Sequence, residues 1–120
     1  MSELGLFIRQ LLEHPGVSAA MLIDGTTGLE YGFGGDRSAL PSAAESCDDA
    51  HRISDTLEAV SGRTGLENIT VTTTLSHYVT QVIPRKRGDS LLLVVALARE
   101  STNLALAARQ IDEHARKLLA

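Results

Sequence analysis

The segment LLEHPGVSAAMLIDGTTGLEYG, residues 11–32, restricts the fold more than any other part of the chain. Pro15 lacks a backbone N–H and Gly16 tolerates a positive φ, so a helix that precedes them must end there. The apolar run Val17–Ile23 is typical of a strand, and the turn residues DGTTG follow it. A second, weaker strand opens at Leu29. The segment therefore predicts a helix that leads directly into a β-hairpin.

Length and composition predict one small domain. The chain has 120 residues, 43% of them hydrophobic, which is enough to bury a single core, so we expect one domain over residues 1–120. The net charge of −4 disfavours nucleic acid as a partner, because phosphate binding requires clustered Lys and Arg. No apolar run approaches the roughly 18–20 residues of a membrane span, and the N-terminal sequence does not resemble a secretory signal. We therefore expect a cytoplasmic protein without membrane insertion.

Three segments have the apolar periodicity of helices, and the middle one has two unequal apolar halves. The first covers residues 4–12 and the last covers residues 104–118. The middle helix is expected to begin at Ser42, which can form a capping box with Glu45, and to end at Gly62. Its bulky half consists of Ile53, Leu57 and Val60, and its small half consists of Ala43, Cys47, Ala50, Ser54 and Ser61.

The remaining regular segments have the patterns of strands. Residues 90–98 are apolar on both faces, which is typical of a central strand covered above and below. Residues 69–75 alternate apolar side chains with threonines, and residues 77–83 form a further β-prone segment that ends before Pro84. Residues 33–41 are predicted to be a loose connection. The pattern predicts an α/β (α+β) fold, in the order helix, two strands, helix, three strands, helix. We expect a five-stranded antiparallel sheet with two helices on one face and one on the other.

Motifs near both ends of the chain resemble the Roadblock (dynein light-chain) domain family. The PGV motif at 15–17, Asp24 and the Gly28-Leu29 pair match the first hairpin of that family. Leu91–Ala98, followed by STNLAL at 101–106, resembles its last strand and the start of its last helix. The resemblance, to bacterial members in particular, implies a Roadblock/profilin-like sandwich that forms homodimers. In such dimers the sheet continues across paired third strands and the middle helices lie side by side. The resemblance also implies a small Ras-like GTPase as partner.

The residues themselves also favour a dimer. Residues 69–83 contain no charged residue and no proline, although natural edge strands normally carry such residues to block association with other chains. A second copy of the chain can cover this edge in a twofold contact, with the small half of the middle helix alongside. The alternative is that a loop covers the edge and the helix packs only within its own chain. The predicted dimer interface comprises Ala43, Cys47, Ala50, Ser54, Ile69, Thr70, Val71, Thr72, Thr73 and Thr74.

The acidic side of the middle helix is the predicted partner-binding surface. It comprises Glu45, Asp48, Asp49 and Asp55, and the alternative interpretation is a solvated helix face. The predicted function is that of a non-catalytic, homodimeric regulator or scaffold that binds and modulates a small Ras-like GTPase. Two alternatives stay open. One is a small-molecule-sensing module of profilin-like fold, and the other is a generic complex-assembly scaffold without a GTPase.

The sequence offers no clear catalytic, cofactor or metal site. Asp48, His51 and Asp55 share a helix face at a spacing that could hold a metal ion, but solvated charges are the preferred interpretation. The glycine-rich segment 32–36 is followed neither by Gly-Lys-Ser/Thr nor directly by a helix, so we interpret it as a flexible loop rather than a phosphate site. His114 is expected on a solvated face. Arg85-Lys86-Arg87 is the only basic cluster, interpreted as a solvated hairpin tip in preference to a contact with an acidic partner. We expect no enzyme activity, no cofactor and no bound metal.

Overall fold

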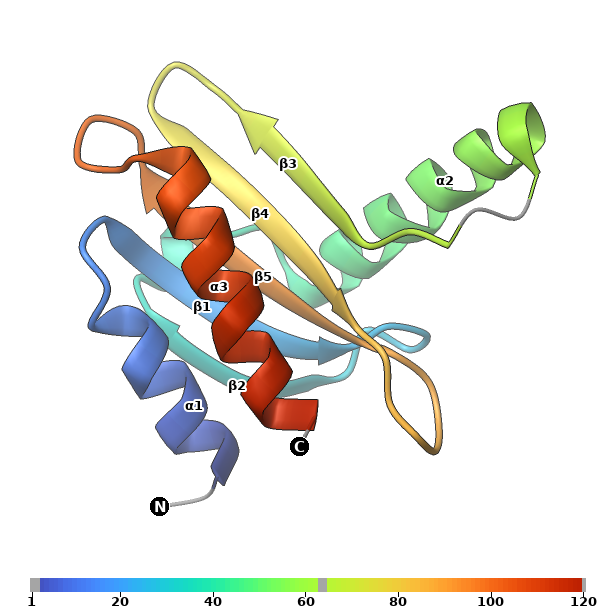
Figure 1. The fold of residues 1–120 in the computed structure, drawn as a ribbon, viewed down its shortest axis with the longest axis horizontal. Helices are drawn as coiled ribbons and strands as arrows, with labels where there is room; N and C mark the ends of the chain where they lie inside the picture. Colours follow the sequence, from blue (N-terminus) through green and yellow to red (C-terminus); the bar gives the residue numbers. More distant parts are fainter. Residues whose placement is uncertain (1–2, 63–64, 120) are drawn as a thin grey trace.

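A computed structural model describes residues 3–62 and 65–119, which contain the predicted order of helices and strands (Figure 1). In chain order the elements are α1 (Glu3–Leu12), β1 (Val17–Asp24), β2 (Glu30–Gly35), the short 3-10 helix η1 (Arg37–Ala39), α2 (Ala43–Ser61), β3 (Asn68–Thr72), β4 (Ser76–Ile83), β5 (Leu91–Ala98) and α3 (Leu104–Leu119). Among the described residues, no helix combines the length and apolarity needed to cross a membrane.

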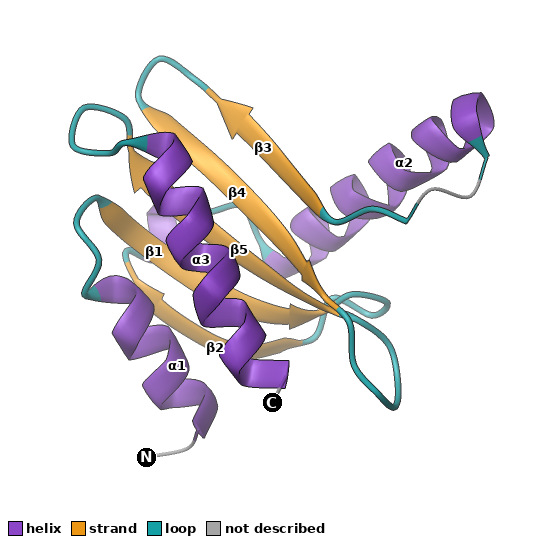
Figure 2. Ribbon diagram, in the orientation of Figure 1, coloured by secondary structure: helices purple, strands orange, loops and turns teal. Residues whose placement is uncertain are grey.

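The five strands form one antiparallel sheet in the order β2-β1-β5-β4-β3. The apolar strand β5 lies in the middle, where it pairs with β1 and β4. Figure 2 shows α1 and α3 on one face of the sheet and α2 on the other. The predicted α+β fold, with two helices on one face and one on the other, is therefore confirmed. Strands β2 and β3 form the two edges of the sheet.

Alternate residues of β5 supply a separate core on each face of the sheet. Leu93 and Val95 pack toward α1 and α3, whereas Leu92 and Val94 pack toward α2. Burying each such side chain contributes roughly 1.5–3 kcal/mol, which explains why this strand has no polar face. The larger core, under α1 and α3, comprises Phe7, Ile8, Leu11, Ala20, Leu22, Val79, Ile83, Leu91, Leu93, Val95, Leu97, Ile111 and Ala115. The smaller core, under α2, comprises Met21, Ile23, Cys47, Ala50, Leu92 and Val94.

The glycine-rich segment is a strand and not the flexible loop that its composition predicted. Gly32, Gly34 and Gly35 belong to β2, which pairs with β1. Helix α1 packs directly on this strand. A Cβ atom added at Gly34 would lie 2.6 Å from Leu12 Cδ1 and 2.7 Å from a methyl group of Ile8. The glycine therefore permits the close approach of α1, and the prediction of a loose connection was wrong because a tertiary contact sets the glycine requirement.

The edge strand is shorter than predicted. Strand β3 ends at Thr72, so Thr73 and Thr74 lie in the turn to β4 and not in the strand. The Thr73 hydroxyl accepts hydrogen bonds from the backbone N–H groups of Leu75 at 3.3 Å and Ser76 at 3.1 Å. A threonine hydroxyl can stabilise a turn in this way. The turn was not predicted because Thr73 and Thr74 continue the alternation of apolar residues and threonines that is typical of a strand.

His114 lies in the core region between two helices, which corrects the prediction of a solvated position. Its ring stacks on Phe7 with 4.5 Å between centroids, and its Nε2 atom lies 3.0 Å from the Phe7 carbonyl oxygen. Only 8% of the residue is exposed. Helix α1 covers this side of α3, and a helical pattern in one segment carries no information on which other helix will cover it.

Candidate interaction surface

Strand β3 presents an uncovered edge. Among the described residues it pairs only with β4, through Ile69–Thr80 and Val71–Tyr78 among other pairs. Ile69 is half-buried and Val71 is 49% exposed, and both line the α2 side of the sheet. Thr70 lies on the opposite face, toward α3. Because β3 contains no charged side chain, its free N–H and C=O groups are available to another strand.

An apolar groove of about 260 Å³ separates α2 from the outer strands of the sheet. Its apolar lining comes from both sides, with Ile53 and Ala50 on α2 and Val71, Tyr78 and Val94 on the strands. The full lining comprises Pro41, Ser46, Asp49, Ala50, Arg52, Ile53, Ile69, Val71, Tyr78, Thr80 and Val94. The groove is therefore continuous with the uncovered edge of β3.

Helix α2 rests on the sheet only with its N-terminal half. Ser42 caps it as predicted, because its hydroxyl accepts a hydrogen bond of 3.1 Å from the Glu45 backbone N–H. The helix ends at Gly62, as expected, where φ is +74°. Its C-terminal half extends past the sheet in Figure 1, and Leu57 and Val60 are 46% and 83% exposed.

The two apolar halves of α2 have different environments. Cys47 and Ala50 of the small half are buried against the chain's own sheet, Ala43 packs at the border of this core, and Ser54 is half-buried. The bulky half is the one that faces the groove and solvent. The part of these four residues in a dimer stays a prediction. In the structure Ala43, Cys47 and Ala50 pack against the sheet of their own chain.

The four predicted acidic residues are all exposed, but they lie in two groups. Glu45 takes part in the capping box with Ser42, and Asp49 forms an ion pair of 3.1 Å with Arg52 beside the groove. Asp48 and Asp55 are seven residues apart and so share one side of the helix, away from Asp49. Within residues 3–62 and 65–119, the acidic surface without local pairing is therefore centred on Asp48 and Asp55.

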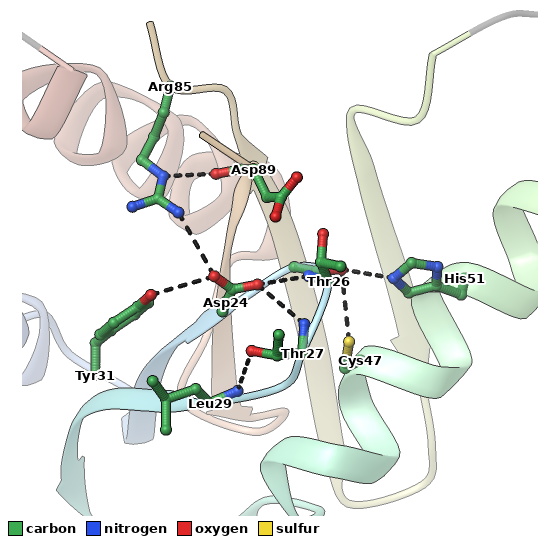
Figure 3. Close-up of polar contacts among 10 residues, drawn as sticks. Asp24, Thr26, Thr27, Leu29, Tyr31, Cys47, His51, Arg85 and Asp89 are labelled. Carbon is green, nitrogen blue, oxygen red and sulfur yellow. Dashed lines mark hydrogen bonds and ion pairs between the residues drawn. The ribbon is translucent and has the colours of Figure 1, made fainter. Parts of the chain in front are cut away.

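A buried carboxylate organises the turn between β1 and β2 (Figure 3). Asp24 Oδ1 accepts hydrogen bonds from the backbone N–H groups of Thr26 at 2.8 Å and Thr27 at 3.0 Å. Its Oδ2 accepts one from the Tyr31 hydroxyl at 3.2 Å and lies 3.6 Å from the Arg85 guanidinium. These contacts hold the pKa of Asp24 below its ordinary value of 3.8, and the hydrogen bond from the Thr27 N–H makes the largest contribution.

The same turn holds α2 in place. His51 Nε2 lies 2.6 Å from the Gly25 carbonyl oxygen, and the Cys47 thiol donates to this oxygen at 3.5 Å. Burial, followed by the charges of Asp48 and Asp24, raises the pKa of Cys47. The turn thus joins α2 on one side to Arg85 of the β4–β5 hairpin on the other. The sequence indicated Asp24 as a turn residue and as part of a family motif, but it did not predict these contacts.

The possible metal site of Asp48, His51 and Asp55 is not formed among the described residues. His51, predicted as one of three possible metal ligands, uses its ring to contact the Gly25 carbonyl. No group of three or more His, Cys, Asp or Glu side chains could hold a metal ion within residues 3–62 and 65–119. What the structure presents is an open strand edge, an apolar groove and an exposed helix.

Comparison with known proteins identifies the fold. No family model and no curated protein matches the chain. Among solved structures, a Roadblock/LC7 domain from Streptomyces avermitilis is 16% identical, with a TM-score of 0.71 over 98% of this chain and 95% of that one. A gliding protein, MglB from Thermus thermophilus, is 15% identical, with a TM-score of 0.70 over 95% and 86%. A structure described as MglB with a tetrameric arrangement is 16% identical, with a TM-score of 0.74 over 95% and 83%. The chain therefore has the Roadblock/LC7 fold, which confirms the resemblance indicated by its sequence motifs.

Proposed function

We propose that this chain is a non-catalytic, cytoplasmic regulator that forms a homodimer and binds a small Ras-like GTPase. In this proposal residues 1–120 form one domain, and the protein acts by positioning its partner. The observation that carries the proposal is the uncovered, uncharged edge of β3 beside the exposed apolar residues of α2.

The edge of β3 and the bulky half of α2 provide the dimer contact. Twofold pairing of β3 would extend the sheet into a second copy and satisfy the backbone groups of both edges. Leu57, Val60 and Val71 are each at least 46% exposed. Val71 lines the groove that opens toward this edge, together with Ile53 of the bulky half of α2. A stable interface buries about 1,200–2,000 Å² in total, which a strand edge alone does not supply. The exposed half of α2 adds the area that this contact needs.

The acidic surface of α2 is the proposed contact for the GTPase. Asp48 and Asp55 are exposed on the side of the helix away from the groove, so a dimer contact made through the groove leaves them accessible. Opposite charge on a partner would guide its approach and fix its orientation. The partner class itself comes from the family resemblance, and the fold likeness to MglB is consistent with a regulatory role.

Calorimetric titration tests the GTPase contact. A candidate GTPase from the host, loaded with a GTP analogue or with GDP, is expected to bind with different affinities in its two states. The double variant Asp48→Lys/Asp55→Lys should weaken binding about tenfold or more at low salt, because it reverses two charges. The matched control Glu100→Lys/Glu113→Lys changes the net charge equally at exposed positions outside α2 and should change binding less than about twofold.

Other outcomes of this titration, or of native mass spectrometry, would point to different functions. Equal affinity in the two nucleotide states would reject recognition of the switch regions. Absence of binding to any host GTPase would favour the generic scaffold. A small molecule retained in native mass spectrometry would favour a sensor, for which the groove of about 260 Å³ is the corresponding site.

A further inference from the structure

The β4–β5 hairpin carries a basic cluster that the proposed function does not use. Arg85, Lys86 and Arg87 supply three of the 11 Lys and Arg residues in a chain whose net charge is −4. All three are exposed, and they lie between the end of β4 and Gly88. A local concentration of positive charge on an acidic protein is a candidate contact for a partner of opposite charge.

Arg85 is fixed at the base of this hairpin. Its Nε donates to the backbone carbonyl of Asp89 across the turn, and its guanidinium lies 3.6 Å from Asp24 Oδ2. Asp24 is itself held by two backbone N–H groups of the neighbouring turn. Arg85 therefore balances a buried carboxylate and orders the hairpin, while Lys86 and Arg87 stay available as exposed cations.

An aromatic side chain meets Arg85 at the base of the hairpin, and an exposed leucine belongs to the adjoining β1–β2 turn. Tyr31 contacts the same Asp24 oxygen as Arg85 and is 40% exposed, and Leu29 is 60% exposed. In Figure 3 Leu29, Tyr31 and Arg85 lie on one side of Asp24, whereas His51 and Cys47 of α2 lie on the other. We define the hairpin patch as Leu29, Tyr31, Arg85, Lys86 and Arg87. It is separate from the groove and from the acidic surface of α2.

We propose that the hairpin patch binds an acidic segment of another protein, one that carries an apolar side chain among its carboxylates. The carboxylates would contact Lys86 and Arg87, and the apolar side chain would contact Leu29 and Tyr31. Tyrosine and arginine are enriched in protein interfaces, where they combine apolar area with hydrogen bonding. This proposal depends neither on the dimer nor on the GTPase.

The composition of the patch favours a protein over an anionic membrane. Membrane recognition by surface charge usually takes clusters of roughly 4–8 Lys and Arg residues, and each contributes only a small increment. The hairpin has three basic residues, and one of them, Arg85, already faces Asp24. The carboxylate of Asp89 follows these residues in the same loop. A segment with a few well-placed carboxylates matches this number of free cations better than a lipid surface.

Fluorescence anisotropy with a labelled peptide of Glu-Glu-Leu repeats tests the proposal. The full chain should bind this peptide in low salt and lose affinity as salt rises. The variant Lys86→Glu/Arg87→Glu should bind at least about tenfold more weakly. The control Arg109→Glu/Lys117→Glu makes the same charge change at exposed positions of α3 and should shift affinity less than about twofold. Leu29→Ser should weaken binding several-fold without changing the salt dependence.

Four results would overturn the proposal, three from the binding assays and one from the chemical shifts. The first is no peptide binding at millimolar protein, and the second is an equal loss of affinity in the α3 control. The third is binding to vesicles that contain phosphatidylserine without binding to the peptide, which would assign the patch to a membrane. Amide chemical shifts recorded with the same peptide should change most at Leu29, Tyr31 and residues 85–88, and a shift pattern centred on α2 would count equally against it.

Discussion

The Tyr31 hydroxyl donates a hydrogen bond of 3.2 Å to Oδ2 of Asp24, the last residue of the neighbouring strand. The other carboxylate oxygen accepts the backbone N–H groups of Thr26 and Thr27. One side chain therefore closes the β1–β2 turn and joins it to β2. Because Arg85 contacts the same Oδ2 atom, the carboxylate also links this turn to the β4–β5 hairpin.

The first prediction concerns the pH dependence of this carboxylate. Hydrogen bonds hold the pKa of Asp24 below 3.8 in the folded chain. The ionised Asp24 therefore contributes fully to stability when the pH is above the pKa that it has in the unfolded chain. That contribution is lost as the pH falls through the lower pKa of the folded state. Asp24→Asn should lower the melting temperature at pH 7, because an amide cannot accept all of these hydrogen bonds and carries no charge for Arg85.

Thermal unfolding followed by circular dichroism between pH 7 and pH 3 measures this effect. The difference in melting temperature between the two proteins should narrow as the pH falls below the ordinary pKa of 3.8, because Asp24 then takes up a proton first in the unfolded chain and only at lower pH in the folded chain. Hydrogen bonds from Ser38 also lower the pKa of Asp36. Because Asp36 is present in both proteins, its effect on the melting temperature cancels in the comparison. A constant difference over the whole range would show that the charge of Asp24 does not matter.

The second prediction tests the close approach of α1 to β2. Gly34→Ala should lower the free energy of unfolding by about 1–3 kcal/mol, because its new methyl group would overlap Leu12 and Ile8. Gly32→Ala on the same strand is the matched control, since its nearest neighbour would be 3.6 Å away, an ordinary contact distance. Urea denaturation of both variants provides the comparison. Equal effects would contradict the packing described for α1.

The order of the elements could be predicted because it follows from local periodicity. β5 is apolar at every position, and the Ser42 capping box marks the start of α2. The course of β2 could not be predicted in this way, because Gly34 is required by α1, which comes from another part of the chain. The burial of His114 against Phe7 is likewise set by a distant segment.

The candidate site was predictable to a similar extent. The absence of charges identified β3 as an unprotected strand, and the sheet order places it at an edge. The turn chemistry of Asp24 was also open to inference, because an aspartate before Gly-Thr-Thr commonly bonds to nearby backbone N–H groups. Its contacts with Tyr31 and Arg85 were not, since the sequence does not show that the β4–β5 hairpin ends beside the β1–β2 turn.

The third prediction concerns the reactivity of the single cysteine. Cys47 is 4% exposed and its pKa is raised by burial, so little reactive thiolate is available in the folded chain. Modification by a disulfide reagent at pH 8 should be slower than in the urea-unfolded chain by a factor on the order of ten or more. The absorbance of the released thiolate follows the reaction. Equal rates would show that the N-terminal half of α2 does not stay on the sheet.

The last prediction tests the proposed dimer with a charge on the exposed half of α2. Val60→Asp should weaken the dimer about 100-fold or more, because a carboxylate buried at an apolar contact loses its hydration without gaining a partner. Ala59→Asp is the control, since Ala59 is also exposed on α2 but lies about 100° around the helix from Val60, on the side of Asp55, and the variant adds the same charge. A charge at Ala50 would be less informative, because this residue is buried in the chain's own core and its replacement would disturb folding.

Light scattering after size-exclusion chromatography measures the outcome over a range of concentrations. The wild type and Ala59→Asp should have about twice the chain mass of 12.8 kDa at micromolar concentration, and Val60→Asp should approach the monomer mass. Circular dichroism of each variant confirms that the fold is retained. A wild-type monomer at every accessible concentration would reject the dimer, and equal masses for the two variants would place the contact elsewhere than on the bulky half of α2.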